Sequence, residues 1–221
     1  MPSHRPSLCV FALLALAACR HREAPPPDVG PRPTAGPEPA PTAAPVPEPT
    51  PTAEPAPAPA PTTGFVVPRF ERVDIGDSGC SAYLPKGAGP FAREASQDGS
   101  DVYTGDVRVG EFTYTVIAVK LKEPIAEPSL REAMLVSYLD FLKTQLGVTD
   151  AAGYGHGHRL ESEPSAAGVI DFWQGGDGKH YRVKGWVAAR NLGVMLISGP
   201  EEFPNPSVAG VYLDGFRFQR R

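Results

Sequence analysis

The sequence has few cysteines and no long hydrophobic run. Only Cys9, Cys19 and Cys80 occur in 221 residues, too few for the dense disulfide framework of small secreted domains. The longest apolar run extends from Leu8 to Ala18, whereas a membrane-spanning helix needs about 20 apolar residues. These shortages exclude a disulfide-rich module and a protein built from membrane-spanning helices.

The sequence also lacks the short motifs of common enzymes and nucleotide-binding proteins. It contains no G-x-S-x-G elbow, no P-loop, no G-x-G-x-x-G after a strand and no Cys-x-x-Cys. The segment GDSG, residues 76–79, matches the start of the stretch around the nucleophilic serine of trypsin-like proteases. In those enzymes the histidine base precedes the serine, but only His4 and His21 precede Ser78 here. We therefore expect Ser78 to be a turn residue and predict a protein that is not an enzyme and uses no cofactor.

Neither sign of charge is in large excess. Residues 64–221 contain 17 Lys and Arg and 20 Asp and Glu, a formal net charge of −3, with the two signs interspersed. Nucleic-acid-binding domains concentrate positive charge on one face. We therefore predict no nucleic-acid partner.

Residues 1–18 have the layout of a secretory signal. His4 and Arg5 precede the apolar run, and small residues follow it. The ending Leu16-Ala17-Ala18-Cys19 resembles the lipobox of bacterial lipoproteins. The resemblance implies cleavage before Cys19, which then carries a diacylglycerol and usually an N-acyl chain. An ordinary signal peptidase site after Ala18 is the alternative.

The resemblance to bacterial lipoproteins also implies a location. A lipid-bearing Cys19 would tether the mature protein to a membrane without spanning it. Arg20 and His21 follow the cysteine, and absence of Asp there favours the outer membrane over the inner one by the enterobacterial pattern. We expect a protein of the bacterial cell envelope, with its domain in the periplasm or at the surface and with an envelope protein as partner.

The segment after Cys19, up to residue 63, differs in composition from the rest of the chain. From residue 24 onward it alternates Pro with Ala, Glu and Thr and contains no aromatic residue. Such a composition predicts a disordered linker that favours extended polyproline II, about 3.1 Å per residue. Forty residues could then reach on the order of 120 Å. A spacer is the plain interpretation, and a proline-rich ligand for a partner is the alternative.

Residues 64–221 are long enough for one core and alternate strand and helix signals. Strands are predicted over 69–75, 80–85, two segments within 101–121, 166–173, 179–189 and 192–199. Helices are predicted over 129–146 and from Asn205-Pro206 to Leu213. Because strands dominate and short loops join them, we predict the α+β class, an antiparallel β-sheet packed with helices.

The longer predicted helix carries explicit end signals. Ser129 and Glu132 have the spacing of a capping box, and Gly147 supplies a C-terminal stop. We expect its apolar stripe to pack on the sheet. This stripe consists of Leu130, Met134, Tyr138, Phe141, Leu142 and Leu146.

Two segments carry a resemblance to a known family. The opening RFERVDIGDSGCSAYLPKG and the closing NLGVMLISG followed by YLDGFRF resemble PsbP-like domains, a group that includes bacterial lipoproteins related to DcrB. The resemblance implies an αβα sandwich over most of residues 66–219. It also implies a non-catalytic accessory or binding role, which is the function we expect for the tethered domain.

Three histidines offer the alternative of a metal-binding or small-ligand-binding protein. In YGHGHR, an extended chain would place His156 and His158 on the same side, as two metal ligands on a strand would lie. His180 could supply a third imidazole from the neighbouring hairpin. The candidate carboxylate ligands are Glu161, Glu163 and Asp171.

The remaining motifs have both structural and functional interpretations. We expect Cys80 to be a buried small hydrophobe, with a reactive or bridged thiol as the alternative. Trp173, Tyr181 and Trp186 are expected to pack against the core, with an exposed binding patch as the alternative. We expect GGDG, residues 175–178, to be a hairpin turn and not a phosphate loop, because no helix follows it.

Overall fold

A computed structural model describes residues 66–201 and 205–219. The predicted signal peptide (1–18), Cys19 and the remainder of the predicted linker (19–63) lie outside the described residues. The described elements, in chain order, are β1 (Phe70–Asp74), β2 (Cys80–Pro85), β3 (Ala92–Ala95), β4 (Asp101–Val109), β5 (Phe112–Lys120), α1 (Ser129–Gln145), β6 (Val148–Ala151), β7 (Gly155–Leu160), β8 (Glu163–Gly175), β9 (His180–Val187), β10 (Asn191–Gly199), α2 (Pro206–Leu213) and β11 (Arg217–Phe218).

The strands form two sheets, and each assigned pair is antiparallel. The large sheet has eight strands in the order β3-β4-β5-β10-β9-β8-β6, with β7 also paired to β8. The small sheet has the order β1-β2-β11. Short hairpins join β4 to β5, β8 to β9 and β9 to β10. The α1 segment connects β5 to β6, so that β10, which follows later in the sequence, pairs with β5 in the centre of the large sheet.

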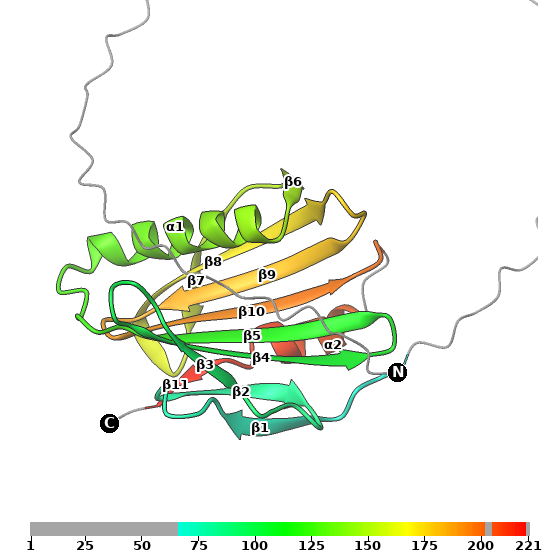
Figure 1. The fold of residues 1–221 in the computed structure, drawn as a ribbon, viewed down its shortest axis with the longest axis horizontal. Helices are drawn as coiled ribbons and strands as arrows, with labels where there is room; N and C mark the ends of the chain where they lie inside the picture. The colour runs from blue at the N-terminus through cyan, green and yellow to red at the C-terminus, as the bar shows by residue number, and fades with distance from the viewer. Residues whose placement is uncertain (1–65, 202–204, 220–221) are drawn as a thin grey trace, which may run out of the picture. The chain divides into compact units, whose positions relative to one another are not determined.

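The elements form three layers (Figure 1). Helix α1 covers one face of the large sheet, and the small sheet with α2 covers the other face. The central strands β5 and β10 are thus buried on both faces. This burial explains why their sequences contain nearly continuous apolar runs in place of a two-residue alternation.

Each face of the large sheet has its own hydrophobic core. The α1-side core joins the buried side of α1 to residues such as Val169, Val183 and Val194. The small-sheet core lies on the opposite face and includes Trp186 and Phe216. The predicted α+β class, an antiparallel sheet packed with helices, is therefore confirmed.

Close approach of the layers depends on one glycine in β10. A Cβ added at Gly193 would lie 2.0 Å from Cζ of Phe216, far inside van der Waals contact. The absent side chain lets the Phe216 ring pack directly over the strand, where it stacks on Trp186 with ring centroids 5.7 Å apart. Gly193 thus determines how closely the C-terminal segment that carries Phe216 packs on the large sheet.

Helix α1 confirms the predicted element but not its details. Its N-cap is Pro128 without a side-chain hydrogen bond, so the predicted capping box is wrong. Ser129 instead donates to Glu127, and Glu132 lies beside His156. The helix ends as predicted, because Gly147 follows it with a φ of +63°.

The buried side of α1 is rotated relative to the predicted stripe. Tyr138 and Leu142 are buried as predicted, but Leu130 is 54% exposed, and Leu135 and Leu139 take the deepest positions. Helix α2 agrees more closely with its prediction, because the side chain of its N-cap, Asn205, accepts the backbone N–H of Ser207. No helix within the described ranges has both the length and the apolar character needed to cross a membrane.

Candidate functional site

The two histidines of the YGHGHR segment lie on β7 but have different charged neighbours. His156 Nδ1 lies 2.8 Å from Oε1 of Glu132 in α1. His158 interacts with the charges of Lys184 and Asp214, an ion pair between β9 and the end of α2. The glycine between the histidines has a φ of +80°, which breaks the alternation of an extended strand. The structure therefore does not place the two imidazoles on one side, contrary to the prediction.

His180 lies far from this pair along the sheet. It is opposite Gln174 on β8, whereas His158 is opposite Gly168. Six residues of strand separate these partners, or roughly 20 Å. In the part of the chain that the structure describes, no group of three or more His, Cys, Asp or Glu side chains could hold a metal ion. The structure thus does not bring His156, His158 and His180 together.

Ser78 lies in the turn between β1 and β2, as predicted. Its side chain is buried, and its Oγ accepts the backbone N–H of Cys80 at 3.1 Å. Its backbone N–H donates to Ile75 at 3.2 Å, and its carbonyl accepts Nδ2 of Asn191 at 2.6 Å. These bonds hold the turn closed and fasten it to the start of β10.

Cys80 begins β2 with its side chain fully buried in the small-sheet core. Burial raises the pKa of its thiol to about 12, although a hydrogen bond with Ser78 acts in the opposite direction. The thiol is therefore protonated at neutral pH and is not a nucleophile. The prediction of a buried small hydrophobe is confirmed.

The aromatic residues of the β8–β9 hairpin are buried on both faces of the large sheet. Trp173 lies opposite Tyr181, with ring centroids 6.3 Å apart, on the α1 side. Trp186 lies on the other side, stacked on Phe216. The predicted packing against the core is confirmed for all three. The predicted turn at 175–178 is also confirmed, because it connects β8 to β9.

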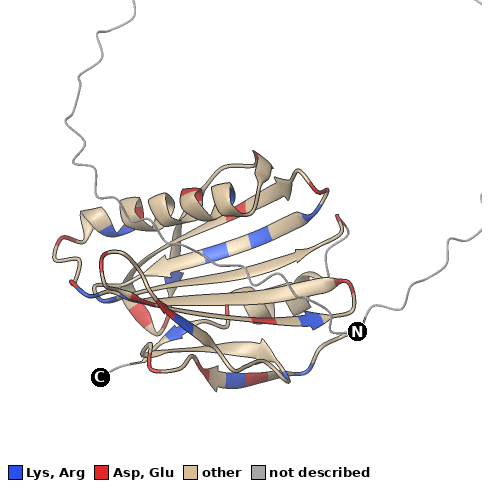
Figure 2. Ribbon diagram, in the orientation of Figure 1, with Lys and Arg blue, Asp and Glu red and all other residues tan. Residues whose placement is uncertain are grey.

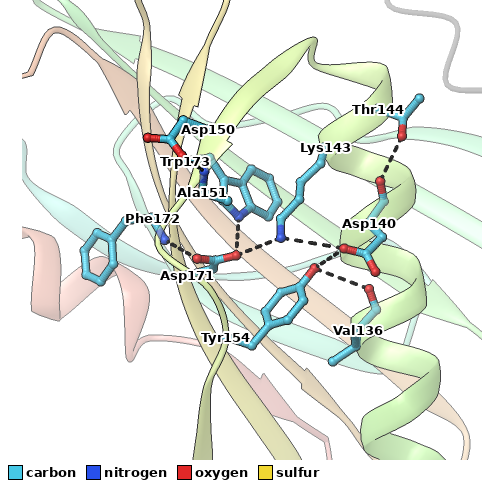
Figure 3. A network of polar contacts seen from close by, with 10 residues as sticks. All are labelled: Val136, Asp140, Lys143, Thr144, Asp150, Ala151, Tyr154, Asp171, Phe172 and Trp173. Atoms are coloured by element: carbon cyan, nitrogen blue, oxygen red, sulfur yellow. Dashed lines mark hydrogen bonds and ion pairs between the residues drawn. The ribbon is translucent and has the colours of Figure 1, made fainter. Parts of the chain in front are cut away.

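A network of polar contacts joins α1 to β8 (Figure 3). Its centre is Asp171, which has no exposed surface. Oδ2 of this carboxylate lies 2.9 Å from Nζ of Lys143 and accepts Nε1–H of Trp173 at 2.7 Å. Oδ1 accepts the backbone N–H of Phe172 at 2.8 Å. Three donors thus compensate the buried charge, as a carboxylate in a hydrophobic core requires.

The network continues from Lys143 to Tyr154, in the connection between β6 and β7. The Tyr154 hydroxyl donates to Oδ1 of Asp140 at 2.7 Å, and Nζ of Lys143 lies 4.0 Å from the centroid of the Tyr154 ring. Burial, followed by the hydrogen bond to Asp140, raises the pKa of Tyr154 well above its usual value. The hydroxyl therefore stays protonated and continues to donate.

This arrangement favours a structural role for the charged groups. Lys143 lies between the carboxylates of Asp171 and Asp140, and Tyr154 closes the outer side of the network. Because both oxygens of Asp171 contact donors of the chain, the carboxylate holds α1 in place on β8. We call the four residues Asp140, Lys143, Tyr154 and Asp171 the α1 clamp.

A cleft of about 210 Å³ opens beside the β1–β2 turn. It lies where the β1–β2 turn meets the end of β5, the start of β10 and the residue after β11. The described residues that line it are Ser78, Gly79, Lys120, Leu121, Arg190, Asn191 and Gln219. We call it the interlayer cleft.

The interlayer cleft carries positive charge and no lining carboxylate among the described residues. Within that part of the chain, the side chains of Lys120 and Arg190 form no ion pair. The two lining amides are engaged differently, because Asn191 donates to the Ser78 carbonyl and Gln219 donates to Asp74. The cleft can therefore offer two uncompensated cations to a ligand.

Sequence reasoning missed both the α1 clamp and the interlayer cleft. One signal did exist for the clamp, since Asp171 interrupts the apolar strand VIDFW and a buried acid needs a partner. The sequence does not identify Lys143 as that partner. The cleft has no local signal at all, because four separate segments build it.

Comparisons with known proteins concern the fold. No protein-family model matches the chain, and no curated protein matches it significantly. Among solved structures, the fold is similar to that of cyanobacterial PsbP (CyanoP) from Synechocystis sp. PCC 6803. The two chains share 11% identity with a TM-score of 0.43, over 75% of this chain and 99% of that chain. At this level of similarity the match carries no conclusion about family or function.

Proposed function

We propose that this protein is a non-enzymatic, membrane-anchored lipoprotein of the bacterial cell envelope, whose domain acts as an accessory or binding module on a long tether. The observation that carries the proposal is the order of three segments along the chain. A segment that resembles a lipobox and ends at Cys19 precedes forty residues rich in Pro, Ala, Glu and Thr, and a folded domain follows them. A tether of this reach places a domain at a partner away from the membrane that holds it.

The structural contacts of three potentially reactive side chains support the non-enzymatic part of the proposal. Ser78 fastens a turn, Cys80 is a protonated thiol in the core, and Asp171 holds α1 on the sheet. Each of these groups could serve as a nucleophile or base in another setting. Here their contacts are with other parts of the same chain.

The proposed location follows from the anchor. With Arg20 and His21 after Cys19, the outer membrane is favoured over the inner one, with the domain in the periplasm or at the surface. An envelope protein is the partner that suits such a tethered domain.

The anchor is tested by labelling growing cells with an alkyne fatty acid and comparing Cys19→Ser with Cys9→Ser. We expect label in the wild type and in Cys9→Ser, and none in Cys19→Ser. We also expect the labelled protein in the outer-membrane fraction. Equal labelling of Cys19→Ser and the wild type would contradict the proposed lipoprotein.

The binding role is tested by crosslinking in living cells, with the chain expressed at its natural level. We compare the wild type with a chain that lacks residues 24–43 and with one that lacks residues 64–221. A single envelope protein should be captured by the first two chains and lost from the third. Capture that is equal in all three, or absent from all, would contradict a binding role for the domain.

A further inference from the structure

We infer that the interlayer cleft is a binding site for a phosphate group. This inference deepens the proposed binding role and rests on it. The argument starts from the lining of the cleft, which combines the Lys120 ammonium and the Arg190 guanidinium with neutral polar groups. The remaining lining is apolar only at Leu121, a buried residue.

The two cations are not neutralised by the acids nearest to them in the fold. Asp101 lies directly across from Lys120 in the β4–β5 ladder, where the two side chains could pair. The Asp101 carboxylate is instead held by the guanidinium of Arg93, with contacts of 3.0, 3.1 and 3.2 Å. Asp77, in the β1–β2 turn, also acts on the charge of Arg93. Arg93 thus pairs with Asp101 and leaves Lys120 without an ion pair among the described residues.

A second acid near the cleft is likewise engaged. Asp74, at the end of β1, accepts Nε2 of Gln219 at 2.7 Å. Gln219 lines the cleft, whereas the carboxylate that it contacts does not belong to the lining. Among the residues that line the cleft, the charged ones are Lys120 and Arg190.

The backbone adds a donor at the same place. Gly79 lines the cleft with a φ of +75°, and its N–H makes no hydrogen bond with any residue of the described ranges. Unpaired backbone N–H groups in tight turns are common anion ligands.

The number of charges favours phosphate over carboxylate. A phosphate monoester carries close to two negative charges at neutral pH, which matches the two cations, whereas a carboxylate carries one. Arginine binds phosphate through paired donors, and lysine binds it as a point charge. The volume of about 210 Å³ suits a phosphate and its immediate substituent, not a large organic ligand.

The bound phosphate group could belong to either of two kinds of molecule with the same chemistry, a soluble phosphate ester or a phospholipid headgroup. The test uses the full chain carrying Cys19→Ser, so that a lipid anchor cannot contribute to binding. Inorganic phosphate is titrated while the amide resonance of Gly79 is followed by NMR. In parallel, the same protein is mixed with sedimenting vesicles of phosphatidylcholine, with and without phosphatidic acid.

The matched variants are Lys120→Gln/Arg190→Gln and the control Lys86→Gln/Arg159→Gln, which removes the same charge from exposed positions elsewhere. We expect saturable shifts at Gly79 for the wild type and the control. We expect affinity to be lower by about tenfold or more in the cleft variant, because charge-assisted hydrogen bonds are lost. Melting of all three chains shows whether they are folded.

The outcomes are distinct. Phosphate binding without vesicle binding supports a soluble ester, and additional binding to phosphatidic acid that the cleft variant loses supports a headgroup. Absence of saturable shifts, or equal affinity in the cleft variant and the wild type, overturns the inference. Because neither assay involves the anchor or the envelope partner, failure here leaves the labelling and crosslinking tests of the proposed function untouched.

Discussion

The two covers of the large sheet are fastened in different ways. On one face, α1 is held by the α1 clamp, with an ion pair of 2.9 Å between Lys143 and the fully buried Asp171. On the other face, the small sheet and α2 are held by apolar contacts, among them the stack of Phe216 on Trp186. Charged groups on this side include the cations that line the interlayer cleft and Lys184, which pairs with Asp214.

This difference suggests that the charged groups have two roles. The buried pair on one face fixes a layer, and the charges at the edge of the other face can bind a ligand. A buried ion pair contributes little net stability but is costly to break on one side, so it fixes α1 in one register. The apolar face needs no charge to hold it, and charges at its edge can serve a ligand. Figure 2 shows acidic and basic residues spread over the described elements and not gathered in one region, so the local surroundings of each charge decide its role.

The largest expected effect is on the clamp. Asp171→Ala leaves the Lys143 ammonium, 18% exposed, without its nearest carboxylate. We expect the free energy of unfolding to fall by about 3–5 kcal/mol, measured by urea denaturation.

Two controls sharpen this result. In Lys143→Met/Asp171→Leu both charges are removed, and much of the lost stability should return. In Asp177→Ala an exposed ion pair with Lys179 and a hydrogen bond from the Lys179 backbone N–H are removed, and the urea midpoint should fall much less than in Asp171→Ala. An equal loss in the single and double clamp variants would contradict the account of the buried pair.

On the opposite face, apolar packing between β10 and Phe216 holds the layers together. Gly193→Ala places a methyl group against the Phe216 ring, and we expect a loss of about 1–3 kcal/mol. Gly210→Ala in α2 is the matched control, because a Cβ there meets no atom within 4 Å. It should stabilise the protein by roughly 0.5–1 kcal/mol. If Gly193→Ala left the free energy of unfolding unchanged, the layers would not be in close contact at β10.

Tyr154 gives a test of the clamp by pH. Because the pKa of Tyr154 is raised in the fold, its contribution is present below the unfolded pKa of about 10 and is lost as the pH rises beyond it. Tyr154→Phe should cost about 1 kcal/mol at pH 7. Its melting temperature should also fall less steeply between pH 9 and 11 than that of the wild type. Burial also raises the pKa of Tyr138 and Tyr212. The melting temperature of Tyr154→Phe should therefore still fall in part between pH 9 and 11.

The smallest expected effect concerns His158. Burial, followed by the charge of Lys184, lowers the pKa of His158, although Asp214 acts in the opposite direction. A lowered pKa means that the unfolded chain binds the proton more readily, so stability is lost as the pH falls below about 6.5. In His158→Gln the melting temperature should fall slightly less between pH 7 and pH 5 than in the wild type. The same slope in both chains would contradict this assignment.

The sequence predicted the class and most elements of the fold because local signals agree with the packing. The strand signal at 80–85, the apolar run of β5 and the Asn205 cap each reflect a contact that the structure shows. The buried side of α1 was predicted less well. Periodicity tolerates a rotation of the helix, and the position of α1 is set by Lys143 reaching Asp171 on a distant strand.

The site residues were predicted less well, for a physical reason. The metal hypothesis assumed that the segment from His156 to His158 is extended, and the positive φ of Gly157 removes that assumption. The interlayer cleft depends on where Lys120 and Arg190 meet the β1–β2 turn. Only the pairing of β5 with β10 and the seating of the small sheet bring them together.

The most direct test of the central claim is hydrogen–deuterium exchange of Asp171→Asn and the wild type, each with and without phosphate. The claim is that the α1 clamp fixes a layer, whereas the interlayer cleft on the other face binds the ligand. We predict faster exchange in 129–145 and 163–175 for Asp171→Asn, with phosphate still protecting the backbone around Gly79. Loss of that protection in Asp171→Asn, or faster exchange spread evenly over both faces, would contradict the account.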